Sequence, residues 1–214
     1  MGRPEQPLQD TYVVLIGESV ARLDAASQFL HEFGTRAFVP VLEAAILQIR
    51  KALELIAIAA IAPDKKQYTA FRATATKDPD FTKDYHAAKI FAALGRINPD
   101  FYPKPLLPAT RQPDGSSHYA DKVTGRLSKK QFERVYDRLG KHLHAHNPWG
   151  ANKQLEQLAA DLPEIIERTR ALIVLHARLI RTSEFQGVWI VEADSPTPHV
   201  LTAIATGPYV VQDG

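Results

Sequence analysis

Cysteine is absent from the 214-residue chain. Without thiols the protein has no disulfide framework, no thiolate-ligated metal site and no cysteine nucleophile. Glycine occurs, but it never gathers into the glycine-rich loop that cradles phosphates in nucleotide-binding folds, and Gly140 and Gly150 stand isolated. The sequence therefore excludes thiol-based enzymes and gives no sign of a dinucleotide-binding fold.

Long apolar runs are also missing. The most apolar run, residues 53–62, has about half of the roughly 20 residues that a bilayer span requires. Lys51 and Asp64 lie close to its ends, so the run predicts a buried core helix. The first ten residues are polar, carry Pro4 and Pro7, and lack the apolar core of a signal peptide. We therefore expect a soluble, cytoplasmic protein with no membrane partner.

The composition that is present is that of one globular domain, because 45% of the residues are hydrophobic and 23% are charged. Apolar residues recur at helical spacing in five segments, which predict helices over residues 18–33, 41–61, 80–97, 128–143 and 152–181. The second helix is apolar around much of its circumference, which predicts that it lies at the centre of a bundle. Gly34 is placed to end the first helix in a left-handed cap.

The other boundaries come from turn and capping signals. Pro63 ends the second helix, and Pro163 predicts a kink or a break in the last one. Ser128 and Gln131 form a capping box that opens the fourth helix. Residues 64–79 show no clear pattern, and residues 99–124 read as a long proline-rich loop.

Near the C-terminus the apolar pattern changes to that of β-strands. Residues 188–193 and 200–205 are β-rich runs joined by turn-forming residues, which predicts a hairpin. We expect a mostly α, multi-helix bundle over residues 1–184 and a β-hairpin extension over 185–214, packed on the same domain. A lone hairpin is marginally stable in water. It must pack on the helices or pair with a partner's strand, and the second option favours a homodimer.

Positive charge is concentrated in one segment. The formal net charge is +2, but between residues 122 and 146 seven Lys and Arg residues oppose two acids, which gives 7 − 2 = +5 there and −3 elsewhere. Clustered cations of this kind attract phosphate. The predicted nucleic-acid-binding residues are Lys129, Lys130, Arg134 and Lys141. The alternative interpretation is a solvated helix face.

The stretch from Arg138 to Pro148 ends this basic segment. On an ideal helical wheel His144 lies opposite the apolar face, His142 lies at its border and His146 lies within it. An imidazole titrates near neutral pH and can act as general acid or base, while a guanidinium matches phosphate oxygens. An Arg beside an outward His is therefore a minimal arrangement for opening a ribose–phosphate bond without a metal or cofactor.

Arg138 and His144, separated by five residues late in a helix of a compact bundle, resemble the motif of the HEPN superfamily. The resemblance covers the motif, its helix and the general helical organisation. It implies a HEPN-like bundle in which two protomers form one composite, metal-independent ribonuclease site. Arg138 would hold the phosphate, and His144 would transfer protons, with His142 as the second candidate. The implied partners are RNA, a second copy, and a cognate antitoxin or phage-defence protein.

Two other interpretations stay open at this point. His142 and His146 are four residues apart, and His31, His86 or His176 could add a third metal ligand, as in the helical bundles related to DinB. Alternatively, the chain is a non-catalytic interaction bundle in which Arg138 pairs with a neighbouring acid. In every case Trp149 is expected to pack rather than to stack on a base.

Overall fold

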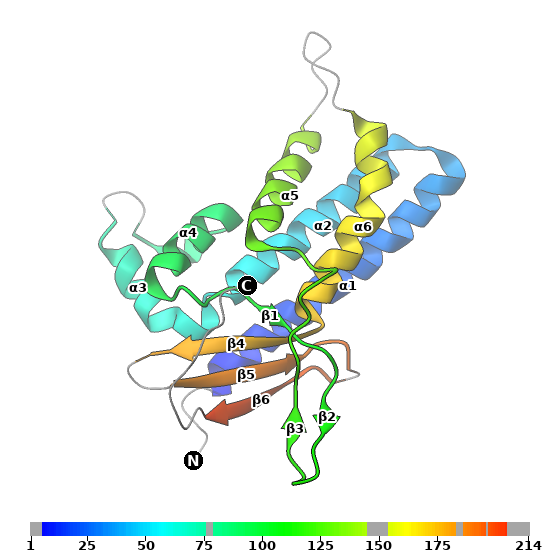
Figure 1. Cartoon of the computed structure of the whole chain (residues 1–214). Helices are drawn as coiled ribbons and strands as arrows, with labels where there is room; N and C mark the ends of the chain where they lie inside the picture. The colour runs from blue at the N-terminus through cyan, green and yellow to red at the C-terminus, as the bar shows by residue number, and fades with distance from the viewer. Residues whose placement is uncertain (1–5, 76–78, 145–153, 183–185, 196, 205–214) are drawn as a thin grey trace.

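A computed structural model describes residues 6–75, 79–144, 154–182, 186–195 and 197–204. Most of the chain is helical, and a small antiparallel sheet lies at one end of the helices (Figure 1). The α-helices are α1 (Gln6–Arg36), α2 (Val39–Ala59), α3 (Lys65–Ala73), α4 (Ala87–Ile97), α5 (Lys129–His142) and α6 (Leu155–Ile173). The predicted class, a mostly α fold with a C-terminal β-hairpin, is confirmed.

The central position predicted for α2 is also confirmed. This helix packs against α1, α4, α5 and α6, and its buried residues are Leu42, Ala45, Ile46, Ile49, Ala52, Leu53, Ile56, Ala57 and Ala59. The helix ends before Pro63, which lies within the 3-10 turn Ala62–Asp64. None of the helices in the described ranges is both long and apolar enough to cross a membrane.

The N-terminal helices differ from the prediction in three ways. Helix α1 begins about twelve residues earlier than expected, and Tyr12 and Ile16 are buried in the added part. Gly34 does not cap it, because the helix continues to Arg36 and Ala37 takes the left-handed conformation, with φ 50°. Helix α3 was not predicted, since among its residues only Tyr68 is buried and the chain shows no apolar stripe there.

The C-terminal sheet contains four strands in the order β1-β4-β5-β6. They are β1 (Lys104–Pro105), β4 (Leu175–Arg181), β5 (Gln186–Glu192) and β6 (His199–Ile204). Strands β5 and β6 form the predicted hairpin. The prediction that the last helix reaches residue 181 is wrong. Helix α6 passes through Pro163 as one helix and ends at Ile173, and strand β4 follows it. The division predicted between residues 184 and 185 falls between β4 and β5, which pair with each other.

The proline-rich segment 99–124 also contains structure that was not predicted. Strand β1 lies in it, and so does a separate two-stranded hairpin of β2 (Thr110–Arg111) and β3 (Ser117–His118). The turn of this hairpin includes Gly115, whose φ of 85° favours glycine.

The sheet is attached to the bundle by buried polar contacts. Tyr12 of α1 hydrogen-bonds His176 of β4 at 2.7 Å, and the ring of Tyr12 lies edge-on to Trp189 of β5. Farther along, Gln9 donates to Thr202 of β6 at 2.8 Å. The C-terminal hairpin therefore packs on α1 and β4, so a partner's strand is not needed to cover it.

Candidate nucleic-acid interface

Helix α5 carries most of the predicted site, and its start follows from local sequence. Ser128 accepts a hydrogen bond from the backbone amide of Gln131, and the Gln131 side chain accepts one from the amide of Ser128. Both bonds of the predicted capping box are present, which satisfies amides that have no partner within the helix. The inner face of α5 then buries Phe132, Tyr136 and Leu139. This anchoring fixes which residues the helix presents outward.

The outer face of α5 is a stripe of charged residues. Its exposed members are Lys130, Arg134, Asp137 and Lys141, and the exposed His144 continues the row two residues beyond the end of the helix. We call these five residues the α5 stripe. With His144 neutral, its charge is 3 − 1 = +2. Lys129 is separate from it, because this side chain is half-buried with its ammonium 5.2 Å from the Phe101 ring centroid.

One end of the stripe borders a hollow between α2 and α5. The residues lining this α2–α5 hollow are Arg50, Asp137, Gly140, Lys141, Leu143 and His144. The Arg50 guanidinium lies 3.9 Å from the Tyr136 ring centroid and donates to the Tyr136 carbonyl at 2.8 Å. It also forms an ion pair with Glu54 at 3.3 Å. The Arg50 guanidinium, fixed by these contacts, therefore lines the same hollow as the exposed imidazole of His144.

Tyr136 and Gly140 keep Arg50 in this position. The Tyr136 hydroxyl donates to Glu54 at 3.0 Å, and burial, followed by the Glu54 carboxylate, raises the pKa of Tyr136 to about 12. A Cβ atom at residue 140 would clash with Arg50 Nη1. Glycine inside a helix costs about 1 kcal/mol relative to alanine. Here it makes room for the guanidinium.

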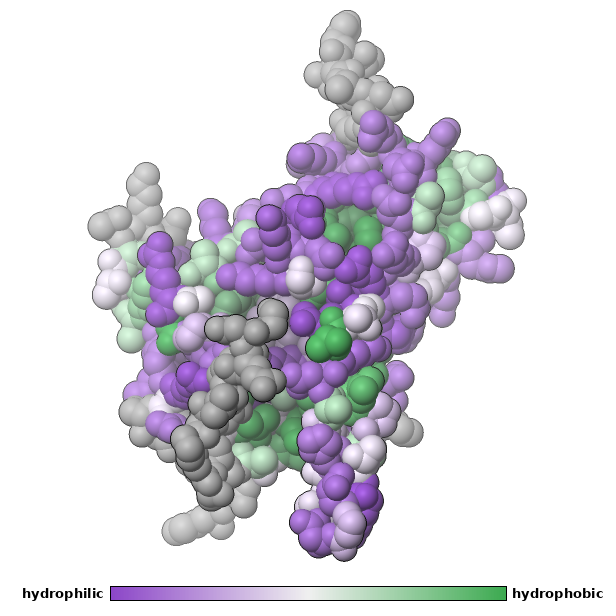
Figure 2. Space-filling view, in the orientation of Figure 1, coloured by the Kyte–Doolittle hydropathy of each residue, from purple (hydrophilic) through white to green (hydrophobic). Residues whose placement is uncertain are grey.

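A second hollow lies on the other side of α5, against α6. Arg138 of α5 donates to Asp161 of α6 at 2.6 Å, and both side chains are more than a third exposed. This bond, followed by one from Gln157, lowers the pKa of Asp161. The lining residues of the α5–α6 hollow are Leu127, Gln131, Arg134, Val135, Arg138, Asp161, Glu164, Ile165 and Arg168. Figure 2 shows a small apolar patch between α5 and α6, surrounded by hydrophilic surface.

The structure thus places the predicted site residues in separate surroundings. Arg138 and His144 line different hollows, so one chain does not bring them to a common cavity. Arg138 pairs with a neighbouring helix, as the interaction-bundle alternative expects. His142 is buried, with 8% of its surface exposed, which leaves His144 as the outward imidazole of the pair. His146 and Trp149 lie outside the described residues.

The histidines considered as metal ligands are dispersed. His176 lies on β4, where Nδ1 donates to the Ile173 carbonyl and Nε2 accepts from Tyr12, and burial lowers its pKa to about 3. His86 packs edge-on against Tyr136. Within the part of the chain that the structure describes, no three histidine or acidic side chains are arranged to hold a metal ion.

Sequence reasoning missed a third hollow, which lies between α3 and α4. Its cations include Arg72, from a segment that showed no clear pattern, and Lys83, from residues 80–86, where the predicted helix is wrong because α4 starts only at Ala87. The one available signal was the seven-residue spacing of Lys89 and Arg96, which places two cations on one face of α4.

Comparisons with known proteins found no match: no protein family, no curated protein and no solved structure matches this chain. The function therefore has to be inferred from the geometry of α5 and of the hollows around it.

Proposed function

We propose that this protein binds RNA along the α5 stripe and that its fold is HEPN-like. The observation that carries the proposal is the stripe itself, an exposed face with Lys130, Arg134 and Lys141 along it and guanidinium groups in both flanking hollows. Such a row of cations neutralises consecutive phosphates and releases their counterions. The choice of RNA over other polyanions comes from the resemblance of Arg138 and His144 to the HEPN motif.

We further propose metal-independent cleavage at the His144 end of the stripe. His144 would take the proton of a ribose 2′-hydroxyl, whose oxygen then forms a bond to the adjacent phosphorus. The bond from phosphorus to the 5′-oxygen breaks, and that oxygen receives a proton from the His144 imidazole of a second copy. Because each chain supplies one exposed imidazole of the pair, this reaction needs a homodimer.

In this scheme Arg50 and Lys141 are the cations beside His144. Both line the α2–α5 hollow with His144, so both can neutralise a phosphate whose neighbouring ribose reaches the imidazole. Arg138 acts from the other hollow, and it must exchange Asp161 for a phosphate oxygen before it binds RNA. The proposal therefore keeps Arg138 as an RNA-binding residue and assigns the proton transfer to His144.

The test is an RNA cleavage assay with EDTA present throughout. We expect cleavage by the unaltered chain, a loss of at least 100-fold in rate for His144→Ala, and no change for His31→Ala, an exposed histidine on α1. Circular dichroism checks that both variants fold. Cleavage that EDTA abolishes and metal restores would contradict the metal-independent mechanism, as would full activity in His144→Ala.

A second candidate is a non-catalytic interaction protein, favoured by the Arg138–Asp161 ion pair that holds α5 against α6. This candidate predicts no RNA binding at moderate salt. Gel-shift measurements at two salt concentrations separate the two, because phosphate binding weakens steeply with salt. RNA binding without cleavage would retain the first part of our proposal and remove the second.

A further inference from the structure

A hollow of about 680 Å³ lies between α3 and α4, away from the α5 stripe. That volume falls within the range of about 300–1,000 Å³ typical of small-molecule sites. Its lining residues come from α3, from residues 83–86 between the 3-10 turn Phe81–Lys83 and α4, and from α4. Three segments therefore form one α3–α4 hollow.

The hollow is positively charged once its internal contacts are counted. Arg72 donates to both carboxylate oxygens of Asp84, at 2.7 and 2.9 Å, and the Tyr68 hydroxyl donates to the same carboxylate at 2.8 Å. Asp84, the one acid among the described lining residues, is thereby neutralised. Lys83, Lys89 and Arg96 remain as exposed cations, with Lys83 4.0 Å from the Asp80 carboxylate.

Helix α4 forms a floor suited to a phosphate. Lys89 and Arg96 are seven residues apart, so they lie on one face with backbones about 10 Å apart along the axis. Ala92 and Ala93 lie between them in the chain, and their small side chains leave space for a ligand above the helix. The helix starts at the N-cap residue His86 with no acid in its first turn and no side-chain cap, which adds positive potential at that end.

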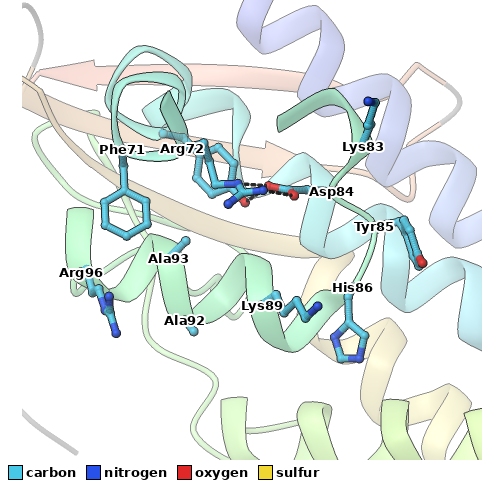
Figure 3. A pocket seen from close by; sticks show the side chains of 11 residues that line it. Phe71, Arg72, Lys83, Asp84, Tyr85, His86, Lys89, Ala92, Ala93 and Arg96 are labelled. Carbon is cyan, nitrogen blue, oxygen red and sulfur yellow. Dashed lines mark hydrogen bonds and ion pairs between the residues drawn. The ribbon is translucent and has the colours of Figure 1, made fainter. Parts of the chain in front are cut away.

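The hollow also offers aromatic surface. Tyr85 is 67% exposed, which is high for so large an apolar ring. Figure 3 shows Tyr85 and His86 at one end of the hollow, Phe71 and Arg96 at the other, and the Arg72–Asp84 pair between them. His86 Nδ1 is buried and has no hydrogen-bond partner among the described residues. Exposed aromatic rings beside cations fit a flat base attached to a phosphate, because bases stack on such rings.

We propose that the α3–α4 hollow binds a nucleotide, with the phosphate between Lys89 and Arg96 and the base on Tyr85. The ligand chemistry is a phosphate joined to an aromatic base, which either a free mononucleotide or one nucleotide of an RNA chain supplies. This inference stands independently of the proposed function, because the residues of the α3–α4 hollow and of the α5 stripe do not overlap.

The experiment measures AMP and inorganic phosphate binding by isothermal titration calorimetry on the full chain. Ala92→Glu places a carboxylate on the exposed floor, and we expect it to weaken AMP binding at least tenfold. Ala160→Glu, the same change at an exposed position of α6, leaves AMP binding unchanged. Tyr85→Ala weakens AMP binding and leaves phosphate binding intact, because it removes only the stacking surface. Absence of AMP binding at millimolar concentration, or equal affinity in all four proteins, would overturn the inference.

Competition identifies the source of the nucleotide. If a short RNA oligonucleotide displaces AMP from the unaltered chain but not from the Tyr85→Ala variant, the hollow binds a nucleotide of RNA. If the oligonucleotide does not compete with AMP, the hollow binds a free nucleotide. RNA cleavage by Ala92→Glu is measured in parallel. Loss of AMP binding with intact cleavage supports this inference separately from the function proposed for α5.

Discussion

Two Arg–Asp pairs in this protein show that distance alone does not decide what an ion pair contributes. Arg138 and Asp161 are 2.6 Å apart and more than a third exposed, while Arg178 and Asp64 are 3.9 Å apart and almost wholly buried. In water a charged pair gains little, since solvent screens it and two side chains must be ordered. In the interior each charge has lost its hydration, so removing one partner leaves the other uncompensated.

The surroundings of the two pairs point to different roles. Arg178 of β4 also donates to the Ala60 carbonyl at the end of α2, and Asn98 bridges Asp64 to the Leu179 carbonyl of β4. Burial raises the pKa of Asp64, and Arg178 and then Asn98 oppose that rise. This group joins the sheet to the helices. The Arg138–Asp161 pair instead lies beside a surface hollow, where the proposed function requires a phosphate to replace the carboxylate.

The largest effect is expected from Arg178→Met. The change keeps an unbranched apolar stem but leaves the Asp64 charge buried without its cation, so we expect a loss of about 3–5 kcal/mol in the free energy of unfolding. Urea denaturation followed by circular dichroism measures it. Adding Asp64→Leu removes the stranded charge, so the double variant is expected to recover part of the loss. A double variant as unstable as the single one would contradict this explanation.

An intermediate effect is expected from the pH dependence of the buried site. His176 is neutral when folded, with its pKa lowered to about 3 from an ordinary value of 6.5. Between these two pH values the unfolded chain therefore binds one more proton than the folded chain. The contribution of neutral His176 to the free energy of unfolding is fully present above pH 6.5 and is lost as the pH falls toward 3. The slope approaches about 1.4 kcal/mol per pH unit for one proton.

The measurement compares the unaltered chain with His176→Gln by urea denaturation between pH 7 and pH 4.5. We expect their stability difference to shrink as the pH falls, because only the unaltered chain loses the histidine contribution. Asp64 acts with the opposite sign, since its raised pKa adds stability at lower pH, but it is present in both proteins and cancels. If the free energies of unfolding of the two proteins change in parallel with pH, His176 does not determine how stability changes at acid pH.

The elements that sequence predicts well are those whose signal is local. The capping box of Ser128 and Gln131 is confirmed, α2 is central as its apolar circumference predicted, and His144, which the helical wheel turned outward, is exposed just beyond the end of α5. Each depends on residues within a few turns of one helix. Strand β4 was missed because both of its faces are buried, which removes the alternation that distinguishes a strand from a helix.

The contacts of the site were beyond sequence reasoning for a different reason. Asp161 is 23 residues from Arg138, and Arg50 lies far from His144 in the chain, so no spacing rule joins them. Only the packing of α5 against α2, and the ion pair that joins it to α6, bring these partners together. The wheel placed His142 at the border of the apolar face, and its burial likewise depends on how closely the neighbouring elements cover that border.

The smallest effect on stability, and the clearest contrast with Arg178, is expected from Asp161→Asn. Because solvent screens this exposed pair, the urea midpoint should stay unchanged. RNA affinity should rise several-fold, because Arg138 no longer has a carboxylate to exchange for phosphate, and the slope of log affinity against log salt should steepen by about 1. Asp24→Asn is the matched control, since Asp24 pairs with Arg170 on α6 away from α5. If both variants bind RNA like the unaltered chain, Arg138 is a structural cation that holds α5 to α6, and the RNA contact lies with the cations of the α5 stripe and Arg50.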